Sequence, residues 1–360
     1  MFKISKLDEA KDLVIGASFL ATGGGGNPDQ GLKYMNEALK NNNIKVVSID
    51  ELPKDTIVAT PYFVGSVSSK EREFKTDIML QSVKELESII GKNIGALAAS
   101  EIGGGNTPIV FYVASKLNLP VVDGDFIGRA APELEQSTAN LFGYSLYPSV
   151  VSTNDGDIIL VKRYADTRHY EYIARQVSII GENSAFVIDT PLTVSQASNA
   201  LVKGSISLSI SIGKVINNPE KHGSVLDDII RIIDGFKIAR GVVKEVNLEE
   251  KEGFLVGEVT IEGEIKNKKA IIKDWIKNEH IFLRINDKPA VFPPDLIVFT
   301  NNNGIPVLNY ELKEGIEVNL IASKAPKIWR SERGLEIFGP KHFGFNYDYV
   351  PVEELIRQFI

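Results

Sequence analysis

The stretch IGALAASEIGGGNTPIVFYVASKLNLPVVDGD, residues 94–125, decides the fold. It begins with a short, continuously apolar run, Ile94–Ala99, which is typical of a strand buried on both faces of a parallel sheet. A glycine-rich segment follows at 101–106, then a helical stretch from Thr107 to Leu117, and then a second short strand at 120–122. Strand, glycine loop, helix and strand in this order indicate an α/β layer with a largely parallel sheet.

The preceding segments continue this alternation. Apolar residues recur at helical spacing over 7–19, and the four consecutive glycines Gly23–Gly26 are expected to end that helix because they favour no regular element. Strands are expected at 45–49 and 57–63, and an amphipathic helix at 74–90. These elements extend the α/β layer towards the N-terminus.

The later half of the chain has a different pattern. Turn residues such as Asn301–Gly304 separate short apolar segments there. Several strands at this spacing predict a small barrel or a sandwich. The strands are expected at 254–262, 270–276, 281–285, 296–300 and 317–322.

Length sets the expected number of domains. At 360 residues the chain exceeds one ordinary hydrophobic core and suits two domains. We predict an α/β N-terminal domain with a largely parallel sheet over 1–165, completed by helices near 190–235 and by the tail at 340–360. A mostly β second domain, barrel-like or sandwich-like, is predicted over 166–189 and 236–339.

Composition excludes several classes of function. The formal net charge of -7 argues against a nucleic-acid partner, and the absence of cysteine excludes thiolate nucleophiles and favours the cytoplasm. The first residues lack the apolar core of a signal peptide, and no apolar run approaches the roughly 20 residues that span a bilayer. We expect a cytoplasmic protein that binds a small-molecule substrate, neither nucleic acid nor membrane, with a homo-oligomer as an open alternative.

Two glycine-rich segments are candidates for contacting a ligand through the backbone. The segment 103–105 lies between a buried strand and the start of a helix, where free N–H groups and the positive helix end bind anions. It is also expected at the carboxyl edge of the sheet, where ligands collect. The alternative is that the glycines serve only the geometry of tight turns. The predicted backbone contacts are Gly23, Gly24, Gly25, Gly26, Gly103, Gly104, Gly105 and Asn106.

Common motifs of nucleotide binding and serine catalysis do not match. The glycines at 23–26 follow a helix and lack a Gly-Lys-Ser/Thr ending, and those at 103–105 lack the Gly-x-Gly-x-x-Gly spacing. No Gly-x-Ser-x-Gly elbow is present. A nucleotide site therefore has little support from these segments.

Asp123-Gly124-Asp125 is the sharpest acidic cluster. If the segment is extended, both carboxylates project to the same side, where they could hold a divalent cation or perform acid/base chemistry. The alternative is that Asp125 caps a following helix, expected near 127–142. No two histidines have metal-ligand spacing, so a bound ion would be a hard one such as magnesium or manganese.

Three further side chains are candidates for the site. Arg129 and Glu133 lie four residues apart, which would place them on one face of the expected helix, either as a surface pair or as ligand-binding groups. Glu101 begins the second glycine segment and is a further acid/base candidate. His342 lies among glycines that would let a ligand approach, although a lone histidine is more often structural.

Four segments together resemble a known family. They are ATGGGGNP at 21–28, EIGGGN at 101–106, VDGDFIGRAAPE at 122–133 and FGFNYDYVP at 343–351. They are similar to the S-methyl thiohydantoin desulfurase family, which is associated with hydantoin utilisation, and the likeness spans nearly the whole chain. This resemblance implies an α/β domain joined to a mostly β domain, and action on a small cyclic amide such as a hydantoin or thiohydantoin.

The leading hypothesis is a hydrolase-like enzyme acting on a cyclic amide or its sulfur analogue. Asp123 is predicted to act as base or metal ligand with Asp125 in support, and Glu101 as a second acid/base group. Backbone amides of the glycine segments would stabilise the oxyanion, and Arg129 would hold a substrate carboxylate. The alternatives are a non-catalytic subunit or ligand-sensing partner of a hydantoinase-type enzyme, and a nucleotide-binding enzyme.

Overall fold

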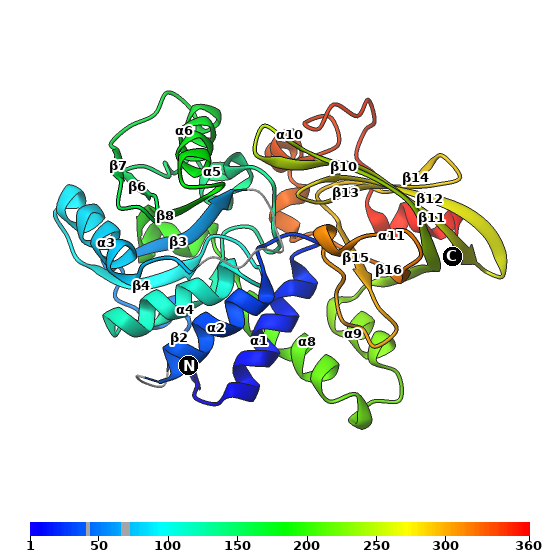
Figure 1. Ribbon diagram of the computed structural model, residues 1–360, viewed down its shortest axis with the longest axis horizontal. Helices are drawn as coiled ribbons and strands as arrows, with labels where there is room; N and C mark the ends of the chain where they lie inside the picture. The colour runs from blue at the N-terminus through cyan, green and yellow to red at the C-terminus, as the bar shows by residue number, and fades with distance from the viewer. Residues whose placement is uncertain (41–43, 66–72) are drawn as a thin grey trace.

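The computed structural model describes residues 1–40, 44–65 and 73–360. Two β-sheets lie side by side along the long axis of the molecule (Figure 1). The first carries helices on both faces, and the second is built from the later strands, coloured yellow to orange. The predicted pairing of an α/β domain with a mostly β domain is confirmed.

The first sheet has a parallel centre and antiparallel margins. Its strand order is β1-β2-β5-β4-β3-β8-β6-β7, with β9 beside β5, and the neighbours β2-β5, β5-β4 and β4-β3 run parallel. Strand β8 pairs with β3 and β6, so it extends the first sheet although part of it lies within 166–189. The strands are β1 (Phe2–Ile4), β2 (Ile44–Val47), β3 (Ile57–Gly65), β4 (Ile94–Ala99), β5 (Val121–Asp125), β6 (Ser149–Ser152), β7 (Ile158–Val161), β8 (Ser184–Thr193) and β9 (Val202–Lys203).

Helices cover both faces of this sheet because alternate residues of its strands point to opposite sides. In β4, Leu97 and Ala99 pack into the core on one face, whereas Ala96 and Ala98 pack into the core on the other. The first face is covered by α1 (Leu7–Leu20), α2 (Pro28–Leu39), α3 (Thr76–Ile90), α4 (Asn106–Leu117) and α8 (Ser205–Asn217). The second face is covered by α5 (Thr138–Leu141), α6 (Thr167–Ile180) and α7 (Val194–Ala200).

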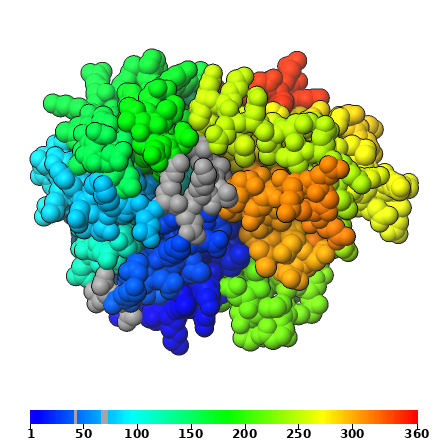
Figure 2. All heavy atoms as spheres, viewed as in Figure 1, coloured from blue at the N-terminus to red at the C-terminus, as the bar shows by residue number. Residues whose placement is uncertain are grey.

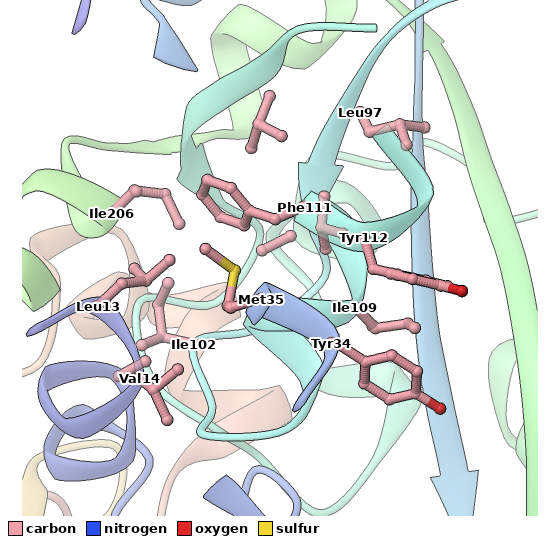
Figure 3. Packing of buried hydrophobic residues seen from close by; sticks show 14 of the residues in the cluster. Leu13, Val14, Tyr34, Met35, Leu97, Ile102, Ile109, Phe111, Tyr112 and Ile206 are labelled. Atoms are coloured by element: carbon pink, nitrogen blue, oxygen red, sulfur yellow. The ribbon is translucent and has the colours of Figure 1, made fainter. Parts of the chain in front are cut away.

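The larger of these two cores holds the N-terminal helices against the loop that follows β4. Figure 3 shows Met35 of α2 among Leu13 of α1, Ile102 of that loop and Phe111 of α4. All four side chains are fully buried. Because Ile102 directly precedes Gly103, this packing helps to position the glycine-rich segment 103–105.

The second sheet is entirely antiparallel and curled, which agrees with the barrel-like form of the prediction. Its order is β14-β13-β12-β11-β10-β16-β15. Two-residue loops close three of its hairpins, and in each loop both residues have positive φ, as at Glu252 (54°) and Gly253 (80°), which suits the right-handed twist of the strands. The strands are β10 (Phe236–Lys251), β11 (Phe254–Ile265), β12 (Lys268–Lys277), β13 (Glu279–Ile285), β14 (Lys288–Val291), β15 (Leu296–Thr300) and β16 (Glu317–Ser323).

The two sheets share apolar packing. Leu296 and Val298 of β15 and Ile321 of β16 belong to the same buried cluster as α1, α8 and α9 (Val225–Ile233). In Figure 2 the orange residues of the second sheet lie directly against the blue N-terminal helices. The last helices of the chain are α10 (Glu332–Phe338) and α11 (Val352–Leu355), and a 3-10 turn at Ile356–Gln358 follows them. Within the described ranges no helix has the length and apolar character needed to cross a bilayer.

The helix expected over 127–142 is wrong. Residues 126–133 form a loop, followed by a short 3-10 turn at Leu134–Gln136 and then α5. The cause is local: Asp125 Oδ2 accepts hydrogen bonds from the N–H groups of Ile127 (2.9 Å) and Gly128 (2.6 Å), and Gly128 has a φ of 87°. These bonds turn the chain before a helix can begin.

Helices α1 and α8 cross in direct backbone contact. A Cβ added to Gly16 would lie 1.7 Å from the carbonyl oxygen of Ser209, and one added to Gly213 would lie 1.8 Å from that of Asp12. No real side chain tolerates such distances to a backbone atom, so the helices would have to separate. Glycine at these two positions therefore sets the spacing of the helix pair.

We predict that Gly213→Ala lowers the free energy of unfolding by about 1–3 kcal/mol, as overpacking of a core does. Alanine favours a mid-helix position over glycine by roughly 0.5–1 kcal/mol, which reduces the loss without reversing it. Gly223→Ala is the control, because its Cβ would have nothing within 4 Å. Urea unfolding of both variants measures the difference, and equal midpoints would contradict the crossing contact.

Candidate functional site

A cavity of about 370 Å³ lies where the C-terminal ends of β3 and β4 face the second sheet. Its lining includes Tyr62 and Phe63 of β3, Glu101 after β4, and Glu279 at the start of β13. This is the edge of a parallel sheet at which ligands bind in open α/β folds. The volume falls in the usual range for a small-molecule site.

The two glycine-rich loops meet backbone to backbone beside this cavity. The carbonyl oxygen of Gly25 accepts hydrogen bonds from the N–H groups of Gly105 (3.0 Å) and Asn106 (3.1 Å). A Cβ on Gly103 would lie 2.3 Å from that oxygen, and a Cβ on Gly25 would lie 2.6 Å from the Cα of Gly103. The amides at the start of α4, predicted to cradle an anion, therefore bind a carbonyl of the protein itself.

The predicted backbone contacts divide into two groups. Gly25, Gly26, Gly105 and Asn106 line the cavity. The other four lie behind its wall. The carbonyl of Gly23 accepts from the N–H of Asn309 (2.9 Å), Gly24 packs on Glu279, Gly103 donates to Thr107 Oγ1 (3.0 Å) and Gly104 packs on Ser18.

Glu101 projects from the loop after β4 into the cavity wall. Its Oε1 accepts from Asn106 Nδ2 (2.8 Å) and its Oε2 accepts from the N–H of Ala131 (3.2 Å). Burial raises the pKa of Glu101 to about 7, against the lowering effect of these two hydrogen bonds. Asn106 is itself fixed by its Oδ1, which accepts from the N–H of Phe63 (3.0 Å). The sequence identified both residues, and the structure brings them together.

Glu279 is a second cavity carboxyl, which the sequence analysis did not identify. The residue is only 2% exposed, and no donor among the described residues lies within hydrogen-bond distance of its Oε2. Burial raises its pKa well above the ordinary value, and the charge of Glu101 raises it further, whereas Arg129 and Arg175 lower it. A glutamate at the start of an ordinary antiparallel strand carries no local signal of such a role.

Asp189 forms a third polar feature of the wall, also missed from the sequence. Its carboxylate accepts from Thr60 Oγ1 (2.7 Å), Tyr62 OH (2.7 Å), Tyr170 OH (2.8 Å) and Thr190 Oγ1 (2.9 Å). Burial raises the pKa of Asp189, and the four hydroxyl donors counteract it. Thr190 has a φ of 51°, which is unfavourable for a β-branched residue and is held here by the surrounding bonds.

The carboxylates of Asp123 and Asp125 are not among the groups that line the cavity. Asp123 accepts from the N–H (3.0 Å) and Oγ (2.5 Å) of Ser207, in the first turn of α8, and so caps that helix. Asp125 is fully buried and closes the turn described above, and burial raises its pKa to about 7. Asp123 therefore caps a helix that the sequence did not assign to it, and the bonds of Asp125 close a turn where a helix cap was the expected alternative.

Arg129 is buried between the two domains and donates hydrogen bonds to both. Its guanidinium makes five hydrogen bonds, to the carbonyls of Ala130, Pro294, Asp295 and His280 and to Thr22 Oγ1. A guanidinium has five N–H donors, so none remains for the substrate carboxylate that the sequence analysis assigned to it. Burial lowers the pKa of Arg129 to about 10, against the opposing effect of nearby acidic groups.

Glu133 lines the cavity but is already paired. Its carboxylate contacts Lys277 and accepts from His342 Nε2 (2.5 Å). Burial alone would raise its pKa, but these two partners outweigh it and lower the pKa to about 2. In the described part of the chain, Glu133, Glu135 and His342 have ligand atoms close enough to hold a metal ion. Lys277 already neutralises Glu133 there, so a cation would have to displace its ammonium group.

We predict that the free energy of unfolding falls as the pH rises towards 7. The pKa of Glu101 is raised from 4.5 to about 7 by folding, so its stabilising protonation is complete below 4.5 and is lost through pH 7. Asp125 acts in the same direction. Urea unfolding at several pH values gives the free energy of unfolding as a function of pH. This free energy should fall less steeply with pH for Glu101→Gln than for the wild type, and an equal dependence on pH would contradict the raised pKa.

Arg129→Lys should destabilise the protein by roughly 2–5 kcal/mol, because at least two buried acceptors lose their donors at about 1–3 kcal/mol each. Arg231→Lys is the matched control, since the Arg231 side chain is 77% exposed. Its effect should stay within about 0.5 kcal/mol. Chemical unfolding of the two variants tests this. Similar free energies of unfolding would show that the hydrogen bonds of Arg129 contribute little to stability.

Two models of known protein families match the sequence. The S-Me-THD-like N-terminal domain matches residues 8–163, and the S-Me-THD-like C-terminal domain matches residues 165–352. A crystal structure of a protein from Chromobacterium violaceum covers 98% of this chain and 100% of its own, with a TM-score of 0.78 and 20% identity, a likeness that shows the fold alone. No curated protein matches the chain. Since the two domain matches together span most of its length, the chain belongs to the S-Me-THD-like family.

Proposed function

We propose that the protein is an enzyme that hydrolyses a small cyclic amide of the hydantoin or thiohydantoin type in this cavity. The observation that carries the proposal is Glu101, a cavity carboxyl whose pKa is raised to about 7. Such a group is partly ionised at neutral pH and is a stronger base than an ordinary glutamate. Membership of the S-Me-THD-like family supports the choice of ring.

In this proposal Glu101 acts as the general base. It removes a proton from a water molecule while the water oxygen attacks the ring carbonyl carbon, and the carbonyl oxygen takes up the negative charge. When the carbon–nitrogen bond of the ring breaks, Glu101 returns the proton to the leaving nitrogen. The reaction consumes one water molecule and leaves an open chain that bears a new carboxyl group.

Glu279 supplies the hydrogen bond to the developing oxyanion. Burial raises its pKa well above the ordinary value, which favours the neutral carboxyl group, and a neutral acid donates a hydrogen bond where a carboxylate would repel. The N–H groups of Gly105 and Asn106 are committed to the Gly25 carbonyl. The role that the sequence analysis gave to the glycine amides therefore passes to Glu279.

We predict that Glu101→Gln lowers the turnover of hydantoins about 10²–10⁴-fold, the usual contribution of a general base. Wild-type turnover should rise with pH through about 7, as Glu101 loses its proton. Asp123→Asn is the matched control, because Asp123 caps α8 outside the cavity and its loss should change turnover only a few-fold. The measurement is steady-state kinetics of the wild type and of both variants over a pH range of about 5–9.

Two results would contradict the proposal. Full activity of Glu101→Gln would remove Glu101 as the base, and loss of activity in a well-folded Asp123→Asn protein would return that role to Asp123. A thermal-shift screen of hydantoins and nucleotides separates the other candidates, since a ligand that binds the native state raises its melting temperature. Stabilisation by hydantoins without turnover would favour a ligand-sensing partner, and stabilisation by nucleotides alone would favour a nucleotide-binding enzyme.

A further inference from the structure

The cavity is lined by acidic groups. Among the described residues of its wall the only cationic side chain is Arg175. The carboxyl groups that line it are those of Glu101, Glu133, Asp189, Glu250 and Glu279. A wall of this composition repels carboxylate and phosphate groups and attracts N–H donors and cations.

Most of these charged groups already have partners within the protein. Glu133 is paired with Lys277 and His342, and the carboxylate of Asp189 accepts from four hydroxyl groups. Arg175 donates to Glu171 and to the carbonyls of Gly65, Gly253 and Pro132, and its guanidinium lies 3.7 Å from the centre of the Phe254 ring. The single cation is therefore held by the protein and is poorly placed to receive an anionic ligand.

Glu279 differs from these residues. Its Oε2 has no hydrogen-bond donor among the described residues, although the side chain is almost completely buried against the cavity. A buried acceptor without a partner destabilises the protein, a penalty that a ligand donor would remove. Gly24 packs on the other oxygen of Glu279, where a Cβ would lie 2.0 Å from Oε1, so the side chain has little freedom to turn away.

We propose that Glu279, together with Glu101, selects a neutral or positively charged ring that presents N–H donors of the amidine or ureide kind, and rejects ligands that carry a carboxylate or phosphate. This inference rests on the proposed function in one respect, because both assume that the ring binds in the cavity where hydrolysis takes place. A cationic ring supplies a donor to Oε2 and stabilises the ionised forms of the two carboxyl groups, which repel each other when no cation is bound. An anionic ligand does neither, and the carboxyl group formed by hydrolysis is repelled from the site.

Three ring compounds of similar size test the selection by calorimetry: hydantoin, the 2-aminoimidazolinium cation, and hydantoin-5-acetate. Titrations in two buffers of different ionisation enthalpy at neutral pH also count the protons exchanged. We expect the cation to bind at least about tenfold more tightly than the anion, since unfavourable charge pairs cost several kcal/mol. Binding of the cation should release protons from the Glu101–Glu279 pair.

Glu279→Gln keeps the shape of the side chain but cannot lose a proton to become a carboxylate when a cation binds, so it should abolish both the preference for the cation and the Glu279 share of the proton release. Glu135→Gln is the control, because Glu135 is outside the cavity lining and pairs with Arg168. If Glu279→Gln does not fold, the ranking of the three compounds and the proton count on the wild type still decide. Tighter binding of the anion, or an unchanged preference in folded Glu279→Gln, would overturn the inference.

The same experiment separates this inference from the proposed function. If the cation binds with proton release that depends on Glu279 while no ring compound is hydrolysed, the selectivity stands and the hydrolase proposal fails. If hydantoin is hydrolysed with dependence on Glu101 while the anion binds as tightly as the cation, the hydrolase proposal stands and the selectivity fails.

Discussion

The backbone contact between Gly25 and the start of α4 holds the rest of the site in place. The Gly25 carbonyl accepts from two consecutive N–H groups there, and glycine at Gly103 is required because a Cβ would lie 2.3 Å from the same oxygen. Just before this contact, the carbonyl of Thr22 accepts from the N–H of His280 (2.8 Å) in the second sheet. One stretch of loop thereby fixes the edge that carries Glu101 relative to the strand that carries Glu279.

The electrostatics of the cavity depend on a residue that does not touch it. Arg129 is fully buried, and its charge, together with that of Arg175, lowers the pKa of both Glu101 and Glu279. Burial acts on both carboxyls in the opposite direction and is the larger effect. The guanidinium thus limits how far their pKa values rise. Its five hydrogen bonds keep it at a constant position, so this influence does not vary with the ligand.

The sequence predicts what depends on local patterns. The apolar run before Glu101, the glycines and the following helix identify the sheet edge, and with it Glu101 and Asn106. Asp189 is missed because its burial arises from the pairing of its strand with β3, which is distant in the chain. Glu279 is missed because it is buried against the loop at Gly24, which is also distant in the chain. The Asp123-Gly124-Asp125 pattern shows the converse limit. Its spacing is that of paired carboxylates, yet Asp123 caps α8 through Ser207, which lies 84 residues further along the chain.

The same glycine-rich sequence pattern is compatible with a site that binds anions and with a site that repels them. Free amides at a helix start attract anions, and amides that already hold a carbonyl do not. Here the amides of Gly105 and Asn106 are occupied, while the space beside them is bounded by carboxyl groups of raised pKa. Glu101 exchanges its proton near pH 7. A wall of this kind has little means of binding a phosphate. The glycines serve that chemistry indirectly, by letting two loops approach closely enough to enclose Glu101 and Glu279 in one cavity.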